Sequence, residues 1–200
     1  MTAPESAAGE PDLSRLLPEL MRRYQAADAD SADALVGLLN PILARYYYAI
    51  TGDARLVDDL LQDCWLRIHR ARSSYRPGEP VLPWIFAIAR HTRVDSYRRW
   101  QRSAGRESNI DDIPRHPASD PRQALDARLQ AGAILNALQS LPEGQREVLM
   151  MLKVGDMTVE EVAQATGSTA PAVKQKAYRA YQAVRRILGL QRKEESDELR

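Results

Sequence analysis

The side chains with the most evident chemistry in this sequence are arginine and lysine, which gather in two short segments. Between residues 90 and 106, six arginines accompany a single acid, Asp95, so the segment carries a local charge of +5. The segment 170–188 holds five further cations and no acid. Guanidinium and ammonium groups neutralise phosphates, so these segments favour binding of nucleic acid.

Four aromatic side chains lie near the first basic segment and narrow the class of nucleic acid. They are Tyr75, Trp84, Tyr97 and Trp100. Arginines that follow a phosphate backbone beside rings that stack on bases suit single-stranded or melted DNA. Packing inside the protein is the competing role, and it is the favoured one for Trp84 and Phe86. Three further aromatics are expected to pack first of all: Tyr46, Tyr47 and Tyr48.

The second basic segment follows a pattern typical of a helix-turn-helix. Thr158 and Glu161 have the spacing of a capping box, which opens a short helix. Gly167 permits a sharp turn, and Ser168 or Thr169 can cap the next helix. In such a motif the second helix places its N-terminal side chains in the DNA major groove, although a solvated basic surface is the alternative. The candidate contacts are Lys174, Gln175, Lys176 and Arg179.

No set of residues in the sequence has the spacing of a catalytic or metal site. The three histidines stand in unrelated contexts, and a glycine-rich phosphate loop is missing. Asp58, Asp59 and Asp63 could hold a metal ion, but three acids on one helical face are more typical of a surface that contacts protein or solvent. The single cysteine, Cys64, is interpreted as a small core residue. We predict no catalytic residue, no metal and no cofactor.

The elements that position these side chains are predicted to be helices. Ala and Leu total 51 residues whereas Val and Ile total 19, a balance that favours an all-α fold. Apolar residues recur at helical spacing from Leu56 to Ile68 and leave the acids on the outer face. A preceding helix over residues 32–50 is predicted to end at Gly52, and another helix covers residues 82–100. Helices over 124–138 and from Pro142 onward precede the helix-turn-helix.

A proline-rich stretch divides the chain into two small helical domains. Pro114, Pro117 and Pro121 fall within eight residues, and such a stretch cannot lie in a regular helix. The predicted organisation is a domain at 13–100, a flexible linker at 101–122, a helix-turn-helix domain at 123–190, and disordered tails at 1–12 and 191–200.

The sequence also predicts a cytoplasmic protein that does not insert into a membrane. Its longest apolar stretch, nine residues from Val81 to Ala89, is too short to cross a bilayer. The first twelve residues contain no lysine or arginine, so the basic start of a signal peptide is missing. A lone cysteine fits a reducing compartment.

The two domains resemble regions 2 and 4 of the extracytoplasmic-function (ECF) group of bacterial RNA polymerase sigma factors. The resemblance is carried by LVDDLLQDCWLRIHRARSSYRPGEPVLPWIFAIARHTRVDSYRRW and by LPEGQREVLMMLKVGDMTVEEVAQATGSTAPAVKQKAYRA. The two motifs in this order, on either side of a proline-rich linker, are strongly specific. The sequence departs from the family at KQKAYRA, where a Lys-Ser-Arg-type run ending in His-Arg is usual, and at Pro83, where a basic or small residue is common.

The resemblance implies a role for each candidate surface. Region 2 contacts the β′ clamp helices of the polymerase through its acidic helix, and its loop, here residues 72–81, captures a flipped base of the −10 element. Region 4 contacts the −35 element and the β flap. The implied residues are Asp59, Gln62 and Asp63 for core polymerase; Tyr75, Arg76, Trp84, Arg90, Arg93, Arg98 and Arg99 for the −10 element and melting; and Lys174, Gln175, Lys176 and Arg179 for the −35 element.

The expected function is therefore that of an ECF sigma factor, which binds core RNA polymerase and promoter DNA, assists melting, and is held inactive by an anti-sigma protein. One alternative is a helix-turn-helix regulator that acts without core polymerase. A second is a polymerase-associated protein that no longer melts DNA. Run-off transcription with core enzyme distinguishes the expected function from the first alternative.

Overall fold

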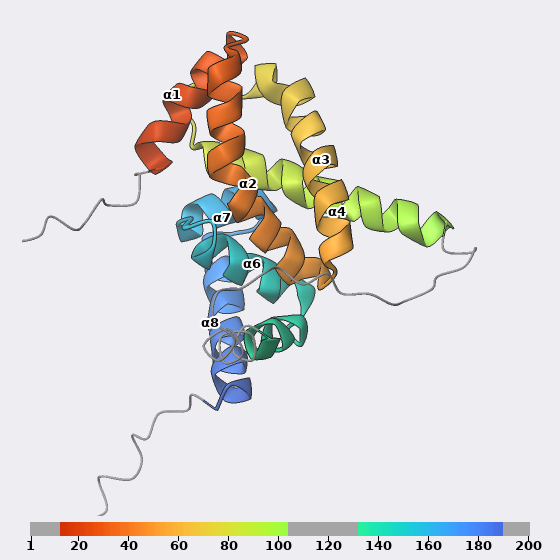
Figure 1. Ribbon diagram of the computed structural model, residues 1–200. Helices are drawn as coiled ribbons and strands as arrows, with labels where there is room; N and C mark the ends of the chain where they lie inside the picture. Colours follow the sequence, from red (N-terminus) through yellow and green to blue (C-terminus); the bar gives the residue numbers. More distant parts are fainter. Residues whose placement is uncertain (1–12, 104–131, 190–200) are drawn as a thin grey trace, which may run out of the picture.

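The computed structural model describes residues 13–103 and 132–189, and the regular structure in both ranges is helical (Figure 1). The predicted all-α fold is confirmed. Residues 132–139 are also helical. The other elements are α1 (Leu13–Gln25), α2 (Ala29–Thr51), α3 (Ala54–Ala71), the short 3-10 helix η1 (Arg72–Ser74), α4 (Val81–Ser103), α6 (Glu143–Lys153), α7 (Val159–Thr166) and α8 (Ala170–Ile187).

The first unit consists of α1 to α4, drawn in red to green in Figure 1. Helix α2 ends where predicted, because Gly52 adopts a left-handed conformation with φ of 71° and donates its N–H to Tyr48 O. Asp53 then caps α3 by accepting the N–H of Arg55 at 2.9 Å. Helix α1 was not predicted, although its buried residues have helical spacing: Leu17, Leu20, Met21 and Tyr24.

Helix α4 is longer than the sequence indicates at both ends. Pro83 is its third residue, where the missing backbone N–H has no intrahelical partner to lose. The helix continues to Ser103, so the first three residues of the predicted linker, 101–103, are helical. This correction has a simple cause, because the prolines that exclude a helix begin only at Pro114. The rest of the predicted linker up to residue 122, and both tails, lie outside the described residues.

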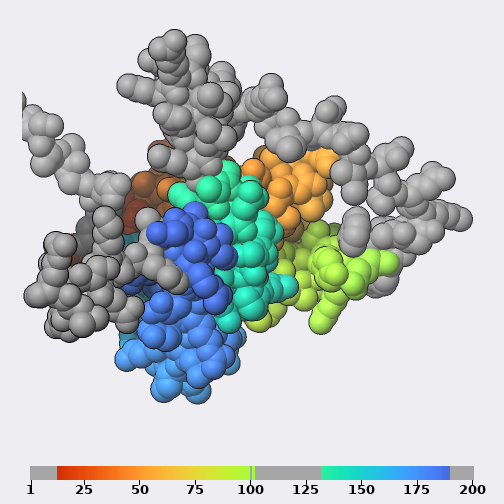
Figure 2. Space-filling model, turned by 90° about the horizontal axis from the view of Figure 1, so that it is seen from below, coloured from red at the N-terminus to blue at the C-terminus, as the bar shows by residue number. Residues whose placement is uncertain are grey.

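The second unit contains the predicted helix-turn-helix. Pro142 is the N-cap of α6, and Thr158 forms the predicted capping box with Glu161 at the start of α7. Gly167 ends α7 in a left-handed conformation with φ of 62°. Of the two candidate caps for α8, Thr169 is the one whose side chain accepts a backbone N–H, that of Ala172 at 3.4 Å. Figure 2 shows α8 (blue) and α6 (teal) side by side, with the outer end of α4 (green) extending beyond them.

The two units pack against each other and share one apolar core. Helix α2 contacts α6, and α4 contacts α7. Phe86 of α4 is fully buried in the same cluster as Met151 and Met157 of the second unit. A Cβ atom at Gly155 would lie 3.1 Å from the Phe86 ring and 2.7 Å from Met151 O, so the close approach requires glycine. The sequence predicted two domains but not this packing between them. Within the described ranges, the structure has no helix long and apolar enough to cross a membrane.

Candidate nucleic-acid interface

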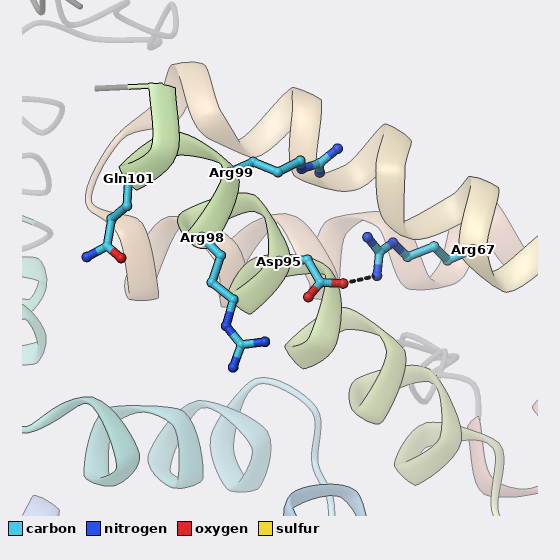
Figure 3. Close-up of a pocket in the computed structure, with 5 residues that line it drawn as sticks. All are labelled: Arg67, Asp95, Arg98, Arg99 and Gln101. Carbon is cyan, nitrogen blue, oxygen red and sulfur yellow. Dashed lines mark hydrogen bonds and ion pairs between the residues drawn. The ribbon is translucent and has the colours of Figure 1, made fainter. Parts of the chain in front are cut away.

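The second half of α4 presents arginines around a surface hollow of about 660 Å³ (Figure 3). Arg67 reaches from α3 and donates to Asp95 at 2.7 Å, and this hydrogen bond lowers the pKa of the Asp95 carboxyl. Arg98 and Arg99 are exposed and point to opposite sides of α4. Arg99 pairs with Asp63, and the hydrogen bond to this carboxylate raises the pKa of the Arg99 guanidinium. The hollow is therefore open, strongly basic and shaped by charges from α3 and α4.

Arg90 and Arg93 lie on the same helix but face the second unit. Arg90 Nε donates to Glu147 Oε2 at 3.1 Å, and Arg93 Nη2 donates to Glu143 Oε1. The Arg93 side chain is 11% exposed and that of Glu147 is 5% exposed. The four arginines of α4 that were predicted to contact the −10 element therefore fall into two pairs. Arg98 and Arg99 are exposed, whereas Arg90 and Arg93 form ion pairs with acids of α6.

The carboxylate of Glu147 is held by two helices of the first unit, α2 and α4. Tyr46 Oη donates to Glu147 Oε1 at 3.0 Å, opposite the contact with Arg90. Burial, followed by the negative charge of Glu147, raises the pKa of Tyr46 well above its ordinary value. The pKa of Arg93 is raised too: burial alone would lower it, but the hydrogen bond to Glu143 and neighbouring charges outweigh that effect. Two cations therefore neutralise two acids at the interface, and the neutral tyrosine donates a hydrogen bond to one of these acids.

The loop after α3 is held by one buried and two partly buried side chains. The Tyr75 ring is 3% exposed and meets Trp84 edge-on, with ring centroids 5.7 Å apart. Gln25 Nε2 donates to the backbone oxygens of Arg72 and Tyr75 at 2.7 and 2.8 Å. Tyr75 therefore supports the loop in this conformation and offers no free face to a base. Ser73, Ser74 and residues 76–80, which include Arg76, are the exposed part of the loop.

Helix α8 turns its predicted DNA contacts away from the core. Val173, Ala177 and Ala180 recur at helical spacing and are buried. This leaves Lys174, Gln175 and Arg179 exposed and Lys176 half-buried. Arg179 lines a second hollow, of about 670 Å³, between α8 and the start of α6. Lys174 and Gln175 lie closer to the N-terminus of α8, the end that a helix-turn-helix directs into the major groove.

The outer face of α3 combines acids with exposed apolar side chains. Asp59 and Gln62 are exposed, whereas Asp63 is half-buried and paired with Arg99. Leu56 and Leu66 are 43% and 48% exposed. Acids with exposed leucines are typical of a surface that docks on protein. Among the described residues, no group of three or more acids, cysteines or histidines could hold a metal ion.

Three side chains of the second unit that contact the first unit were not predicted from the sequence: Glu143, Arg146 and Glu147. Glu143 and Glu147 contact arginines 50 and 57 residues away. Arg146 Nη1 donates to Ile50 O at 2.8 Å, a contact across 96 residues. Hydrophobic periodicity reports which face of a helix is buried and not which distant segment meets it, so the sequence carries no local signal for these contacts.

Comparison with known proteins agrees with this arrangement. Residues 35–103 match the family described as Sigma-70 region 2, and residues 131–184 match Sigma-70, region 4. The chain is 29% identical to the RNA polymerase sigma factor CarQ of Myxococcus xanthus, across 84% of this chain and 95% of CarQ. It is 30% identical to the ECF RNA polymerase sigma factor SigD of Mycobacterium tuberculosis, across 82% of this chain and 85% of SigD.

Two solved structures share the fold. The sigma factor RpoE in complex with the anti-sigma factor NepR, from Bartonella quintana, aligns with a TM-score of 0.64 at 22% identity, covering 80% of this chain and 98% of RpoE. CnrH in complex with the cytosolic domain of CnrY aligns with a TM-score of 0.65 at 23% identity, covering 88% and 98%. From its two matched regions and its identity with SigD along most of both chains, we conclude that the protein belongs to the ECF group of RNA polymerase sigma factors.

Proposed function

We propose that this protein binds core RNA polymerase, directs it to specific promoters and assists DNA melting. The observation that carries the proposal is the distribution of charge over the two sigma regions: an acidic, partly apolar face on α3, and basic surfaces on α4 and α8. The protein acts by binding and not by catalysis, in the cytoplasm, where core polymerase works.

The α3 face is the proposed polymerase contact. Asp59 and Gln62 are exposed, and Leu56 and Leu66 add apolar area that a protein partner would bury. Exposed carboxylates raise the association rate and fix orientation, while apolar contact contributes affinity. Clamp helices of the β′ subunit are the proposed partner, and the β flap is the proposed partner of the second unit.

The basic surfaces are the proposed DNA contacts. Arg98 and Arg99 on the second half of α4 are proposed to contact the backbone of the opening strand. The exposed loop residue Arg76 and the partly exposed Trp84, at the opposite end of α4, are proposed for the −10 element. The N-terminal half of α8 is proposed to enter the major groove at the −35 element. Phosphate contacts of this kind give affinity that falls with salt, whereas base contacts give promoter choice.

We also propose an anti-sigma protein as a partner. The two solved structures compared above are sigma factors in complex with NepR and with the cytosolic domain of CnrY. An anti-sigma protein that covers the α3 acids would block polymerase binding, and one that covers the α4 arginines would block DNA binding.

Run-off transcription with purified core polymerase tests the proposal. We expect promoter-specific transcripts with the unaltered chain and their loss with Asp59→Lys, which reverses an exposed charge on the α3 face. Asp30→Lys reverses an exposed aspartate on α2 and is the matched control. Asp59 is preferred to Asp63, because reversal of Asp63 would also unpair Arg99.

The same assay distinguishes the helix-turn-helix regulator that acts alone. That protein would bind its duplex tightly without core enzyme and would give no gain in transcription. Arg179→Ala should weaken binding to a −35 duplex while core binding is retained. If the unaltered chain never yields promoter-specific initiation with any core enzyme and promoter library, the proposed function is wrong.

A further inference from the structure

Helix α1 touches the loop that is proposed to bind the −10 element. This loop, residues 72–80, joins α3 to α4, and α1 contacts η1 at its start. Helix α1 covers residues 13–25 and precedes the stretch 35–103 that matches Sigma-70 region 2. None of the site residues implied by the resemblance lies on α1. The structure nevertheless places the end of this helix against the loop that base capture requires.

The contact is made by the side chain of Gln25, the last residue of α1. Its Nε2 atom donates to Arg72 O at 2.7 Å and to Tyr75 O at 2.8 Å. A side-chain amide carries two N–H bonds, so Gln25 uses both of them on the loop. Gln25 is half-buried, which shields these hydrogen bonds from competing water. One side chain therefore fixes both ends of the turn from Arg72 to Tyr75.

We propose that Gln25 is a positioning residue for base capture: through its amide group, α1 holds the loop 72–80 in the conformation that receives an unpaired promoter base. This role rests on the proposed function, because it takes the loop to bind the −10 element. Gln25 acts through the loop and not by contact with DNA. A loop that is already ordered loses less conformational entropy on binding than a mobile loop does, so Gln25 promotes opening of the promoter.

The residue before Gln25 holds the same turn by a second route. Arg72 Nη1 donates to His69 O at 2.7 Å, and the Arg72 guanidinium lies 6.0 Å from the centre of the Tyr24 ring. Tyr24 Oη in turn forms a hydrogen bond of 2.9 Å with His69 Nδ1. Consecutive residues of α1 thus contact the side chain and the backbone of Arg72. The loop is held by the end of α1 and not by one isolated hydrogen bond.

The end of α1 is itself fixed to α2. Asp28 Oδ2 accepts from Arg23 Nε at 2.8 Å and from Ser31 Oγ at 2.6 Å, and Ser31 is 1% exposed. Ala27, between the two helices, has a φ of 64°, a conformation that alanine seldom adopts. An alanine held in this way indicates that the surrounding contacts dictate the connection. Gln25 therefore offers the loop a rigid anchor.

The contacts of Gln25 leave the outer surface of the loop available. Gln25 binds backbone oxygens, whereas residues 76–80 are exposed. Tyr75 Oη donates to Glu79 O, which ties this exposed part to a buried ring. The backbone is therefore ordered from the side of α1, while side chains such as that of Arg76 face solvent, where a base can reach them.

Hydrogen exchange of the full-length chain tests the contact. Gln25→Met keeps the length of the side chain and removes both N–H groups. The amides of Tyr75 and Glu79 are hydrogen-bonded to carbonyls within the loop, so their exchange reports its order. We expect Gln25→Met to raise exchange in 72–80 by about fivefold and to leave 159–187 unchanged. Unchanged exchange in the loop would overturn the inference.

Transcription with core polymerase tests the consequence for DNA. One template is a duplex promoter on which the unaltered chain initiates, and the other is the same promoter with a mismatched, already open −10 segment. Gln25→Met should lower transcripts from the duplex by about fivefold and from the open template by less than about twofold, because the open template stays melted without base capture. Gln164→Met, the same change at an exposed site of α7, is the matched control and should alter neither.

The ratio of the two templates separates positioning of the loop from a general loss of structure. Equal losses on both templates would overturn the inference, since the fold or the polymerase contact would then depend on Gln25. Full activity of Gln25→Met on the duplex would overturn it as well, and would leave the proposed function intact. If the unaltered chain initiates on no promoter, the proposed function fails and the role of Gln25 in base capture fails with it.

Discussion

At the scale of single residues, Arg146 connects segments that are far apart in the sequence. Its guanidinium donates to the backbone oxygens of Ile50, Gln139 and Leu141 at 2.8 to 3.0 Å. Carbonyls at helix ends have no intrahelical partner, so a planar group with several donors is well suited to this place. Burial lowers the pKa of Arg146, which nevertheless stays charged at any physiological pH.

We expect Arg146→Lys to destabilise the chain by about 2 kcal/mol, because an ammonium group cannot reach three carbonyls at once and leaves some of them unpaired. The midpoint of urea unfolding measures this. Arg185→Lys, at an exposed site of α8, is the control and should change stability by less than about 0.5 kcal/mol. Equal effects of the two substitutions would contradict the role given to Arg146.

Cys64 gives a prediction about alkaline pH. Burial raises the pKa of its thiol from an ordinary value of 9.0 to about 11, although hydrogen bonds with Tyr47 and Thr92 act in the opposite direction. The folded state therefore holds the proton more tightly than the unfolded state. The corresponding stability is fully present below pH 9.0 and is lost as the pH rises towards about 11.

We expect the free energy of unfolding to fall over this pH range, and to fall less steeply in Cys64→Ala, which has no thiol to titrate. Chemical denaturation at a series of pH values measures both. The buried thiol should also react with iodoacetamide at pH 8 far more slowly in the native chain than in urea. Rapid alkylation of the native chain would show that the thiol is accessible.

At the scale of elements, the helix-turn-helix was predicted well because its signals are local. Thr158, Gly167 and Thr169 each satisfy or end a helix through atoms within a few residues. The end of α2 at Gly52 was predictable for the same reason. Helix α1 was missed although its apolar residues recur at helical spacing. The last three residues of α4, 101–103, were missed because no glycine or proline before residue 104 marks the end of that helix in the sequence.

The capping box of α7 can be tested by Thr158→Ala. Thr158 Oγ1 accepts the N–H of Glu161 at 3.2 Å, and Glu161 Oε2 accepts the N–H of Thr158 at 2.8 Å. Loss of the hydroxyl should cost about 1 kcal/mol of unfolding free energy, seen as a lower melting temperature. Thr158→Ser retains the hydroxyl and should restore most of the loss, whereas equal destabilisation by both variants would argue against the cap.

At the scale of the whole molecule, the division into two units could be predicted but their contact could not. Proline content and composition mark the segment between them, whereas the pairing of Phe86 with Gly155 depends on the three-dimensional approach of residues that share no pattern. For the candidate site, the helices that carry the acidic and the basic side chains, α3, α4 and α8, were predictable. The engagement of Arg90 and Arg93 by acids was not, because it depends on the same approach.

A shared core predicts shared unfolding. All three tryptophans lie in the first unit, at 65, 84 and 100, so fluorescence reports that unit while circular dichroism reports both. We expect the two signals to change at the same urea concentration. Gly155→Val should place side-chain atoms against Phe86 and Met151 O and separate the two transitions. Separate transitions in the unaltered chain would show that the units unfold independently.

The unbroken course of α4, from Val81 to Ser103, fixes the spacing of its arginines. Arg90 and Arg99 are about 14 Å apart along the helix axis, a length equal to about four nucleotides of one duplex strand. An insertion of one residue between Arg93 and Arg98 would rotate Arg98 and Arg99 by about 100° about the helix axis relative to Arg90 and Arg93. Seven inserted residues would return Arg98 and Arg99 almost to their original orientation. The rotational position of the arginines about the axis of α4, and not only their charge, therefore limits which insertions this helix tolerates.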